Sequence, residues 1–138
     1  MIVLDTNVLS EPLRATPNES VIVWLGSVTD DVMLTAISVG EILTGVRALA
    51  AGRRRDGLMA AVELTFATFS DRVLPYDEPA ARSYASLQQS RRELGRPLSV
   101  EDGMIAAICA SRGAGLATRN TKDFESLGIA LIDPWATS

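Results

Sequence analysis

Short apolar runs alternate along this chain with longer stretches in which apolar residues recur at helical spacing. Five runs predict buried strands, at Ile2–Leu4, Val32–Ala36, Arg72–Pro75, Gly115–Thr118 and Ala130–Ile132. Between them, two helical faces are predicted, one from Leu58, Val62, Phe66 and Phe69 and one from Ala81, Tyr84, Leu87 and Leu94. Strands that alternate with helices indicate an α/β fold with a mostly parallel sheet covered on both faces.

The length and composition fit one domain, which we expect to span residues 1–138. With 138 residues, 47% of them hydrophobic, the chain can fill a single core, and it shows no repeat or linker. It opens MIVLDTN, without the features of a secretory signal, and its longest uncharged apolar stretch, Gly103–Ser111, is too short to span a membrane. We therefore expect a cytoplasmic protein with no membrane partner, in which the single cysteine, Cys109, lies in the core.

The absence of histidine removes whole classes of chemistry. Histidine-based acid/base catalysis, Ser-His-Asp hydrolysis and histidine-ligated zinc are excluded, since the chain contains no histidine. Sites built from oxygen ligands select hard cations such as Mg²⁺, Mn²⁺ or Ca²⁺.

The net charge of −4 argues against nucleic-acid binding through a broad basic surface. A nuclease would therefore need positive charge from a bound cation and from local arginines, at positions 53 to 55 and at 91, 92 and 96. Each arginine cluster alone is also explained as a solvated helix end.

Two acidic residues in the first half of the chain lie where an open α/β sheet collects its ligands, at the carboxyl ends of strands. Asp5 directly follows the first predicted strand, in LDTN, although an aspartate there also turns the chain or caps a helix. Glu41 lies early in a predicted helix, in SVGEILTG, flanked by the small residues Ser38 and Gly45. A solvated glutamate that favours the helix dipole is the alternative for Glu41.

Two further acids lie in the second half of the chain, and each also has a structural explanation. Asp102 heads the apolar stripe of residues 105–109, where burial of a carboxylate is costly without a hydrogen bond or a cation. Ser99 and Asp102 also match a capping pattern, which accounts for this acid equally well. Asp123 follows the fourth predicted strand and could instead cap a short helix together with Asn120. If the first and fourth strands are adjacent, all four acids would meet in one site.

Taken together, these segments resemble the PIN domain, specifically the VapC/FitB-like toxins of bacterial toxin–antitoxin pairs. The resemblance spans nearly the whole chain, through VLDTNVLSE, ISVGEILTGV, EDGMIAAICA and LATRNTKDFESLGIALIDPW. It implies a three-layer α/β/α domain with a parallel sheet in strand order 3-2-1-4-5. It also implies a catalytic acidic quartet, supported by polar neighbours: Asp5, Glu41, Asp102 and Asp123, with Thr6, Asn7, Thr118 and Asn120. Glu101 offers an alternative register, but the family's D-x-x-I-A-A spacing favours Asp102.

The resemblance implies a metal-dependent endoribonuclease, with Mg²⁺ or Mn²⁺ as its cofactor. Asp5 and Asp102 would bind the ion directly, Asp123 would complete the site or act through water, and Glu41 would orient water or a second ion. Such an ion lowers the pKa of a bound water and stabilises the leaving oxyanion, so no protein nucleophile is needed.

Two alternatives remain open. One is another Mg²⁺-dependent α/β phosphohydrolase, such as a haloacid-dehalogenase-like phosphatase, but Asn7 stands where that class has its second acid. The other is a catalytically inactive PIN-like interaction module, against which the intact quartet speaks.

The resemblance also implies partners. They are an RNA substrate, a second copy of the chain in a homodimer, and a cognate antitoxin whose basic segment approaches the acidic site through opposite charge.

Overall fold

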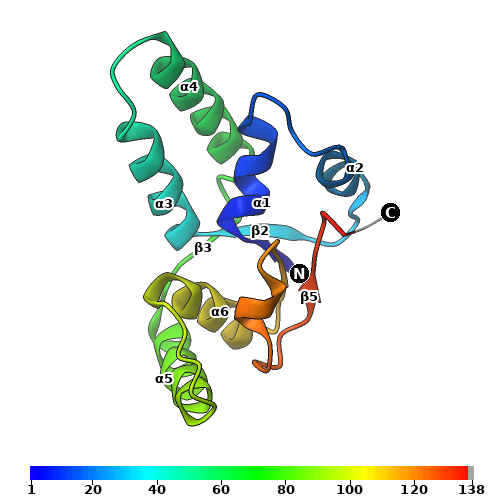
Figure 1. The fold of residues 1–138 in the computed structure, drawn as a ribbon, viewed down its shortest axis with the longest axis vertical. Coiled ribbons are helices and arrows are strands. Elements are labelled where there is room, and N and C mark those ends of the chain that lie inside the picture. The colour runs from blue at the N-terminus through cyan, green and yellow to red at the C-terminus, as the bar shows by residue number, and fades with distance from the viewer. Residues whose placement is uncertain (137–138) are drawn as a thin grey trace.

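The computed structural model describes residues 1–136 and shows a five-stranded parallel sheet between two layers of helices (Figure 1). The sheet order is β3-β2-β1-β4-β5, and every strand pair is parallel. The strands are β1 (Ile2–Leu4), β2 (Val32–Thr35), β3 (Val73–Leu74), β4 (Gly115–Ala117) and β5 (Leu131–Ile132). Both the predicted strand order and the five predicted strands are confirmed. All except β1 are one or two residues shorter than predicted.

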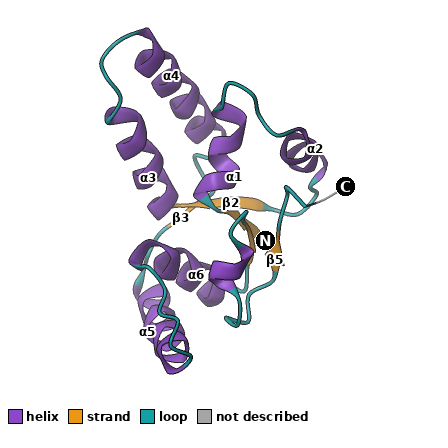
Figure 2. Ribbon diagram, viewed as in Figure 1, coloured by secondary structure: helices purple, strands orange, loops and turns teal. Residues whose placement is uncertain are grey.

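The helices divide between the two faces of the sheet (Figure 2). On one face lie α1 (Thr6–Ser10), the 3-10 turn η1 (Glu11–Leu13), α2 (Glu19–Ser27), α3 (Ala36–Arg47) and α4 (Arg53–Thr68). On the other lie α5 (Glu78–Glu93), α6 (Val100–Arg112) and the 3-10 turn η2 (Thr121–Phe124). Among the described residues, no helix is both long and apolar enough to cross a membrane.

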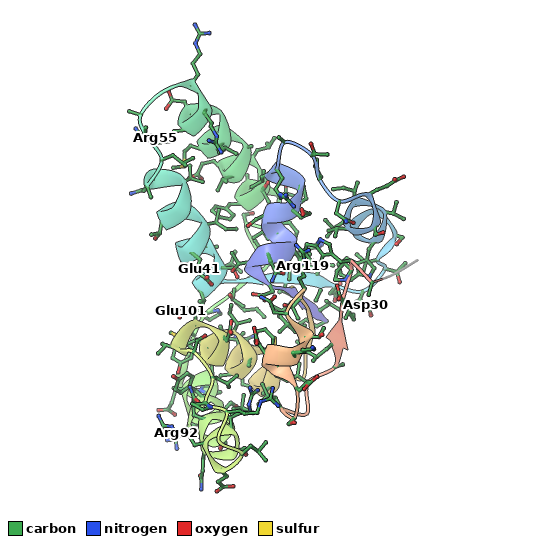
Figure 3. All side chains as sticks on the ribbon, in the orientation of Figure 1. Asp30, Glu41, Arg55, Arg92, Glu101 and Arg119 are labelled. Carbon is green, nitrogen blue, oxygen red and sulfur yellow. The ribbon has the colours of Figure 1, made fainter. Side chains whose placement is uncertain are left out.

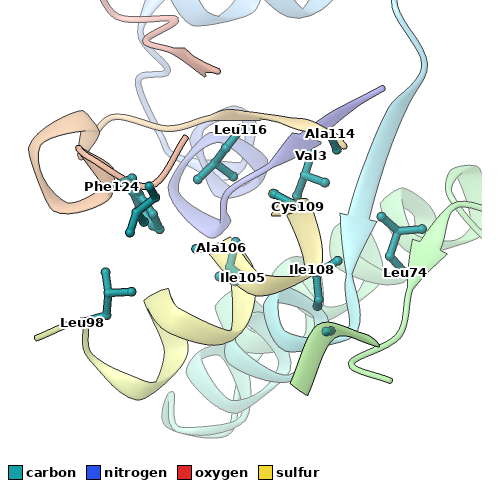
Figure 4. Close-up of a cluster of buried hydrophobic side chains, with 12 residues drawn as sticks. Val3, Leu74, Leu98, Ile105, Ala106, Ile108, Cys109, Ala114, Leu116 and Phe124 are labelled. Atoms are coloured by element: carbon teal, nitrogen blue, oxygen red, sulfur yellow. The ribbon is translucent and has the colours of Figure 1, made fainter. Parts of the chain in front are cut away.

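Each face of the sheet has its own core, because successive side chains of a strand point to opposite faces. Leu4 of β1 packs into the core on the side of α1 to α4, whereas Val3 packs into the core beneath α5 and α6. Figure 4 shows the second core, in which Ile105 and Cys109 of α6 lie against the sheet. Cys109 is fully buried, as predicted, and this burial raises the pKa of its thiol to about 12.

One predicted helical face is confirmed and the other is partly wrong. On α4, Val62 is buried and the other three predicted residues pack against the same core. On α5, by contrast, Ala81 is exposed and Leu94 is 57% exposed, whereas the polar residues Gln88 and Arg91 are buried. These two side chains turn inward because backbone carbonyl groups in the neighbouring loops accept hydrogen bonds from them. An apolar pattern cannot anticipate such a face.

Candidate active site

Asp5 lies at the carboxyl end of the central strand and is the most buried of the predicted site acids. It follows β1 directly, and its backbone N–H donates to the carbonyl oxygen of Ala117 in β4 at 2.9 Å. Only 5% of Asp5 is exposed. Its Oδ1 accepts the backbone N–H of Thr6 at 2.8 Å, and its Oδ2 accepts the Thr118 hydroxyl at 2.8 Å and the Asn7 amide at 3.5 Å. Asp5 therefore caps α1 and still faces the edge of the sheet.

The loop after β4 forms a hydrogen bond with Asp5 through Thr118. Thr118 is fully buried, and its hydroxyl both donates to Asp5 and accepts the backbone N–H of Asn120 at 3.0 Å. Asn7 accepts the backbone N–H of Arg119 at 3.3 Å. Asn120 takes part through its backbone, and its side chain does not cap η2, so the predicted capping role is wrong. The short turn η2 forms instead from its own backbone bonds.

Glu41 is brought to the same edge by the start of α3. The Thr35 hydroxyl caps this helix by accepting the backbone N–H of Ser38 at 3.1 Å. The Thr6 hydroxyl lies 2.8 Å from Ser38 Oγ and 3.1 Å from Glu41 Oε1, within hydrogen-bonding distance of both. Glu41 is otherwise exposed, so Thr6, the first residue of α1, orients a carboxylate that faces solvent.

Asp102 and Asp123 approach from the opposite helical layer. Asp102 lies in the first turn of α6, where its backbone N–H donates to Ser99 Oγ at 3.2 Å. The capping pattern read from the sequence is therefore real, yet the Asp102 carboxylate is only half-buried and remains available. Asp123 lies on η2 and is exposed. Figure 3 shows Glu41 on α3 and Glu101 on α6 near the same edge of the sheet.

The pKa shifts show that these carboxylates share one electrostatic environment. Burial raises the pKa of Asp5, hydrogen bonds from Thr118 and Thr6 oppose that rise, and the charge of Asp123 adds to it. Burial likewise raises the pKa of Asp102, against a hydrogen bond with Ser99, and the charges of Asp5, Asp123 and Glu101 raise it further.

Glu41 belongs to the same cluster. Burial raises its pKa, the hydrogen bond from Thr6 opposes the rise, and the charges of Asp5, Glu101 and Asp102 add to it. The four predicted acids thus come to one edge of the sheet, where charge acts between neighbouring members, and Glu101, which the sequence motif had set aside, acts on Glu41 and Asp102.

The oxygen atoms of these acids are of the kind that binds hard divalent cations, although they do not form a complete set of ligands around one point. Every group in the cluster is an oxygen donor, and a cation would relieve the repulsion that raises these pKa values. Within residues 1–136, no three acidic side chains lie close enough together to form a closed set of ligands. Mg²⁺ commonly uses one or two carboxylates and fills its other positions with water and substrate phosphate. An open site of this kind suits an ion that also binds substrate.

A hollow of about 750 Å³ adjoins the acid cluster, between α1, α3 and α4. Thr6 and Glu41 line its inner end, and Arg14 and Arg54 line it further out. Arg14 donates to Glu11 at 2.8 Å, and Glu11 is only 2% exposed. No sequence pattern marks Glu11 as buried, because the burial of an acid depends on tertiary neighbours. The same hollow is thus lined by an acid of the site and by two arginines, one of which is paired with Glu11.

Known proteins are similar to this chain in both sequence and fold. Residues 2–129 match the PIN domain. The chain is 41% identical over 137 residues to the toxin FitB of Neisseria gonorrhoeae, covering 98% of this chain and 99% of that protein. It is 39% identical over 137 residues to the VapC ribonuclease Y4jK of Sinorhizobium fredii, covering 98% of each.

Solved structures agree. The crystal structure of FitAcB from Neisseria gonorrhoeae matches with a TM-score of 0.94 at 40% identity, covering 99% of this chain and 100% of that chain. DNA-bound VapBC from Salmonella typhimurium matches with a TM-score of 0.80 at 27% identity, covering 96% and 97%. Metal dependence is typical of PIN-domain VapC nucleases. With its fold, its acid cluster and these full-length relatives, the chain belongs to the PIN-domain family.

Proposed function

We propose that this chain is a metal-dependent endoribonuclease and the toxin of a toxin–antitoxin pair. One observation carries the proposal: Asp5, Glu41, Asp102 and Asp123 reach one edge of the sheet from separate elements, and the charges of neighbouring acids add to the effect of burial in raising the pKa values of Asp5, Glu41 and Asp102. Relatives over most or all of the chain are named as ribonucleases, which supports RNA as the substrate.

The residues divide the work as follows. Asp5 and Asp102 would hold Mg²⁺ or Mn²⁺, and Asp123 would complete the site directly or through water. When bound, such an ion activates a water and neutralises charge on the phosphodiester. Thr118 and the backbone of Thr6 fix the Asp5 carboxylate before any ion arrives, because both donate to it. Glu41, oriented by the Thr6 hydroxyl, accepts a hydrogen bond from the attacking water.

Positive charge for the RNA comes from the rim of the hollow and not from the whole surface. Arg14 and Arg54 line the same hollow as Glu41. Arg54 would supply local positive charge for phosphate contacts despite the net charge of −4, whereas the charge of Arg14 is already paired with Glu11. Arg91 does not serve in this way, because it is buried. For Arg91, both sequence interpretations, an RNA contact and a solvated helix end, are wrong.

The proposed partners are a cognate antitoxin and a second copy of the chain. The structural relatives FitAB and VapBC are toxin–antitoxin complexes, which supports an antitoxin partner. A basic antitoxin segment would meet the acid cluster through opposite charge and compete with metal and RNA. Light scattering at micromolar concentration tests the homodimer, and a monomer at that concentration would contradict it.

The function is tested by RNA cleavage with Mg²⁺ or Mn²⁺, with EDTA, and with the Asp5→Asn variant. The exposed Asp56 on α4 provides a matched control, Asp56→Asn, which removes the same charge away from the cluster. We expect cleavage by wild type and Asp56→Asn with metal only, and strongly reduced cleavage by Asp5→Asn. Undiminished cleavage in EDTA would contradict the metal mechanism. No cleavage of any RNA by wild type would favour an inactive interaction module.

A further inference from the structure

Arg91 is a buried cation whose partners are backbone carbonyl groups. It lies near the end of α5, and 4% of it is exposed. Its Nε donates to the carbonyl oxygen of Arg96 at 2.8 Å, and its Nη1 donates to those of Asp123 at 2.9 Å and Glu125 at 3.2 Å. Among residues 1–136, no carboxylate forms an ion pair with Arg91. Arg91 therefore joins α5 to the segment that carries Asp123.

Two of the Arg91 hydrogen bonds lie on either side of Phe124 in the chain. Phe124 is 1% exposed and anchors η2 in the core, between the two carbonyl groups that Arg91 holds. An anchored side chain fixes where a turn lies, but the peptide groups on either side can still rotate. Because Arg91 holds the carbonyls of both Asp123 and Glu125, it fixes that rotation. The direction in which the Asp123 side chain leaves the backbone is fixed with it.

The residue type is explained by this arrangement. A buried charge is costly unless hydrogen bonds compensate it, so a hydrophobic residue would pack against α6 at lower cost. A guanidinium group presents several N–H donors in one rigid plane, whereas a lysine presents a single flexible ammonium group. Donors on separate nitrogens let the Arg91 guanidinium reach carbonyl groups in two segments at once, through Nε and Nη1, whereas a lysine would have to reach them from one nitrogen.

We propose that Arg91 is a positioning residue for the metal site, acting through the backbone of residues 123 to 125 on the direction of the Asp123 carboxylate. This inference rests on the proposed function, since it requires that Asp123 belongs to the metal site. It assigns a role in the site to a side chain that the acidic quartet does not include.

The test compares Arg91→Met with Gln88→Met. Gln88 is a matched control, because it is 6% exposed in the same α5–α6 layer and bonds the backbone of Leu98 at 2.9 and 3.0 Å. Both substitutions remove buried hydrogen bonds and keep an unbranched side chain. Mn²⁺ affinity is measured by electron paramagnetic resonance on folded protein, with amide hydrogen exchange in residues 121–125 as a second readout.

We expect Arg91→Met to weaken Mn²⁺ binding by about 10- to 100-fold, as is typical when an outer support of a metal ligand is lost. Exchange in residues 121–125 should also rise. Gln88→Met should leave exchange in residues 121–125 unchanged, even where it lowers the melting temperature as much, because Gln88 bonds Tyr84 and Leu98 and not this segment. Its loss of Mn²⁺ affinity should be smaller. Should Arg91→Met not fold, Arg91→Lys provides the same comparison, with an intermediate loss expected. Equal Mn²⁺ affinity in the Arg91 and Gln88 variants would overturn the inference.

A double-substitution cycle tests whether Arg91 acts through Asp123. Adding Arg91→Met to Asp123→Asn should weaken Mn²⁺ binding no further, because the group being positioned is already altered. Additive losses would assign Arg91 a different role. If wild type binds Mn²⁺ but cleaves no RNA, the proposed function fails and the affinities still decide the role of Arg91. If wild type binds no Mn²⁺, both fall.

Discussion

The two ends of the acid cluster are held in opposite ways. Asp5 is buried, and side-chain and backbone donors hold both of its carboxylate oxygens. Asp123 is exposed, and among residues 1–136 no hydrogen bond reaches its carboxylate, although Arg91 holds its backbone carbonyl. Hydrogen bonds thus fix the Asp5 carboxylate itself, whereas the position of Asp123 is fixed only through its backbone. This difference predicts that substitutions at or beside Asp5 should reduce RNA cleavage and metal affinity the most.

Replacement of the fixed acid should have the largest effect. Asp5→Asn keeps the shape but removes the charge, so we expect cleavage to fall by at least about 100-fold, the upper end of what loss of an outer support costs. Single-turnover RNA cleavage at saturating Mg²⁺ measures it. Asp123→Asn should cost less than Asp5→Asn in the same assay. The reverse order would break the comparison between the two ends.

Removal of the support beneath Asp5 should have the next largest effect. Thr118→Val is close in volume and deletes the hydroxyl that donates to Asp5 Oδ2. We expect a loss of about 10- to 100-fold in metal affinity or activity. Thr65→Val is the control, because its hydroxyl bonds only the Ala61 carbonyl within α4. Comparable losses in the two variants would mean that a general loss of stability, and not the Asp5 carboxylate, is responsible.

Removal of charge from the middle of the cluster should leave the metal-free fold intact. Asp102→Asn relieves repulsion from Asp5, Asp123 and Glu101, and the backbone N–H of residue 102 still donates to Ser99. We expect an unchanged melting temperature, or a rise of at most about 4 °C, which is roughly 1 kcal/mol in a domain of this size. Calorimetry without metal measures it. A clear fall would mean that the Asp102 carboxylate is structural.

The same variant should lose the stabilisation that metal gives. In wild type, Mn²⁺ at one hundred times its dissociation constant should add about 2.7 kcal/mol, because it binds only the folded state. Asp102→Asn should lose most of this gain at the same concentration. If wild type gains nothing from Mg²⁺ or Mn²⁺, the acids serve only as caps.

The smallest expected effect is on the pH dependence of the metal-free protein. Asp5, Glu41 and Asp102 have raised pKa values, so the folded state binds protons more tightly than the unfolded chain does. Stability should therefore increase as the pH falls from neutral through these raised values, and the gain should be complete below the ordinary values near 4. Urea unfolding across this range measures it, with Asp102→Asn showing a weaker dependence. A steady loss of stability over the same range would contradict the assigned shifts.

Much of the fold was predictable because apolar runs report burial directly. The five strands follow from such runs, and the order 3-2-1-4-5 followed from the PIN resemblance and not from the pattern itself. The resemblance also named Thr6, Asn7 and Thr118 as polar neighbours of the acids, and each forms a hydrogen bond with Asp5, although their supporting roles stay predictions. The catalytic roles of the acids remain predictions.

What the sequence missed has a common cause. Gln88, Arg91 and Glu11 are polar residues that the fold buries. Gln88 bonds the backbone of Leu98, Arg91 bonds the backbone of Asp123, and Glu11 pairs with Arg14. Their partners are mostly backbone carbonyl groups, which every residue has and no sequence pattern marks. Glu101 was set aside because a motif admits one register, whereas charge acts on Glu41 and Asp102 from either position.

The most direct test compares metal occupancy with RNA cleavage in one preparation. Mn²⁺ occupancy by electron paramagnetic resonance and cleavage rate are measured across the same titration, for wild type and Asp5→Asn. If the acid cluster holds the ion that drives cleavage, the two wild-type curves have the same midpoint, and both move to higher Mn²⁺ in the variant. Cleavage that saturates while the site is empty, or an unchanged midpoint in Asp5→Asn, would contradict the account.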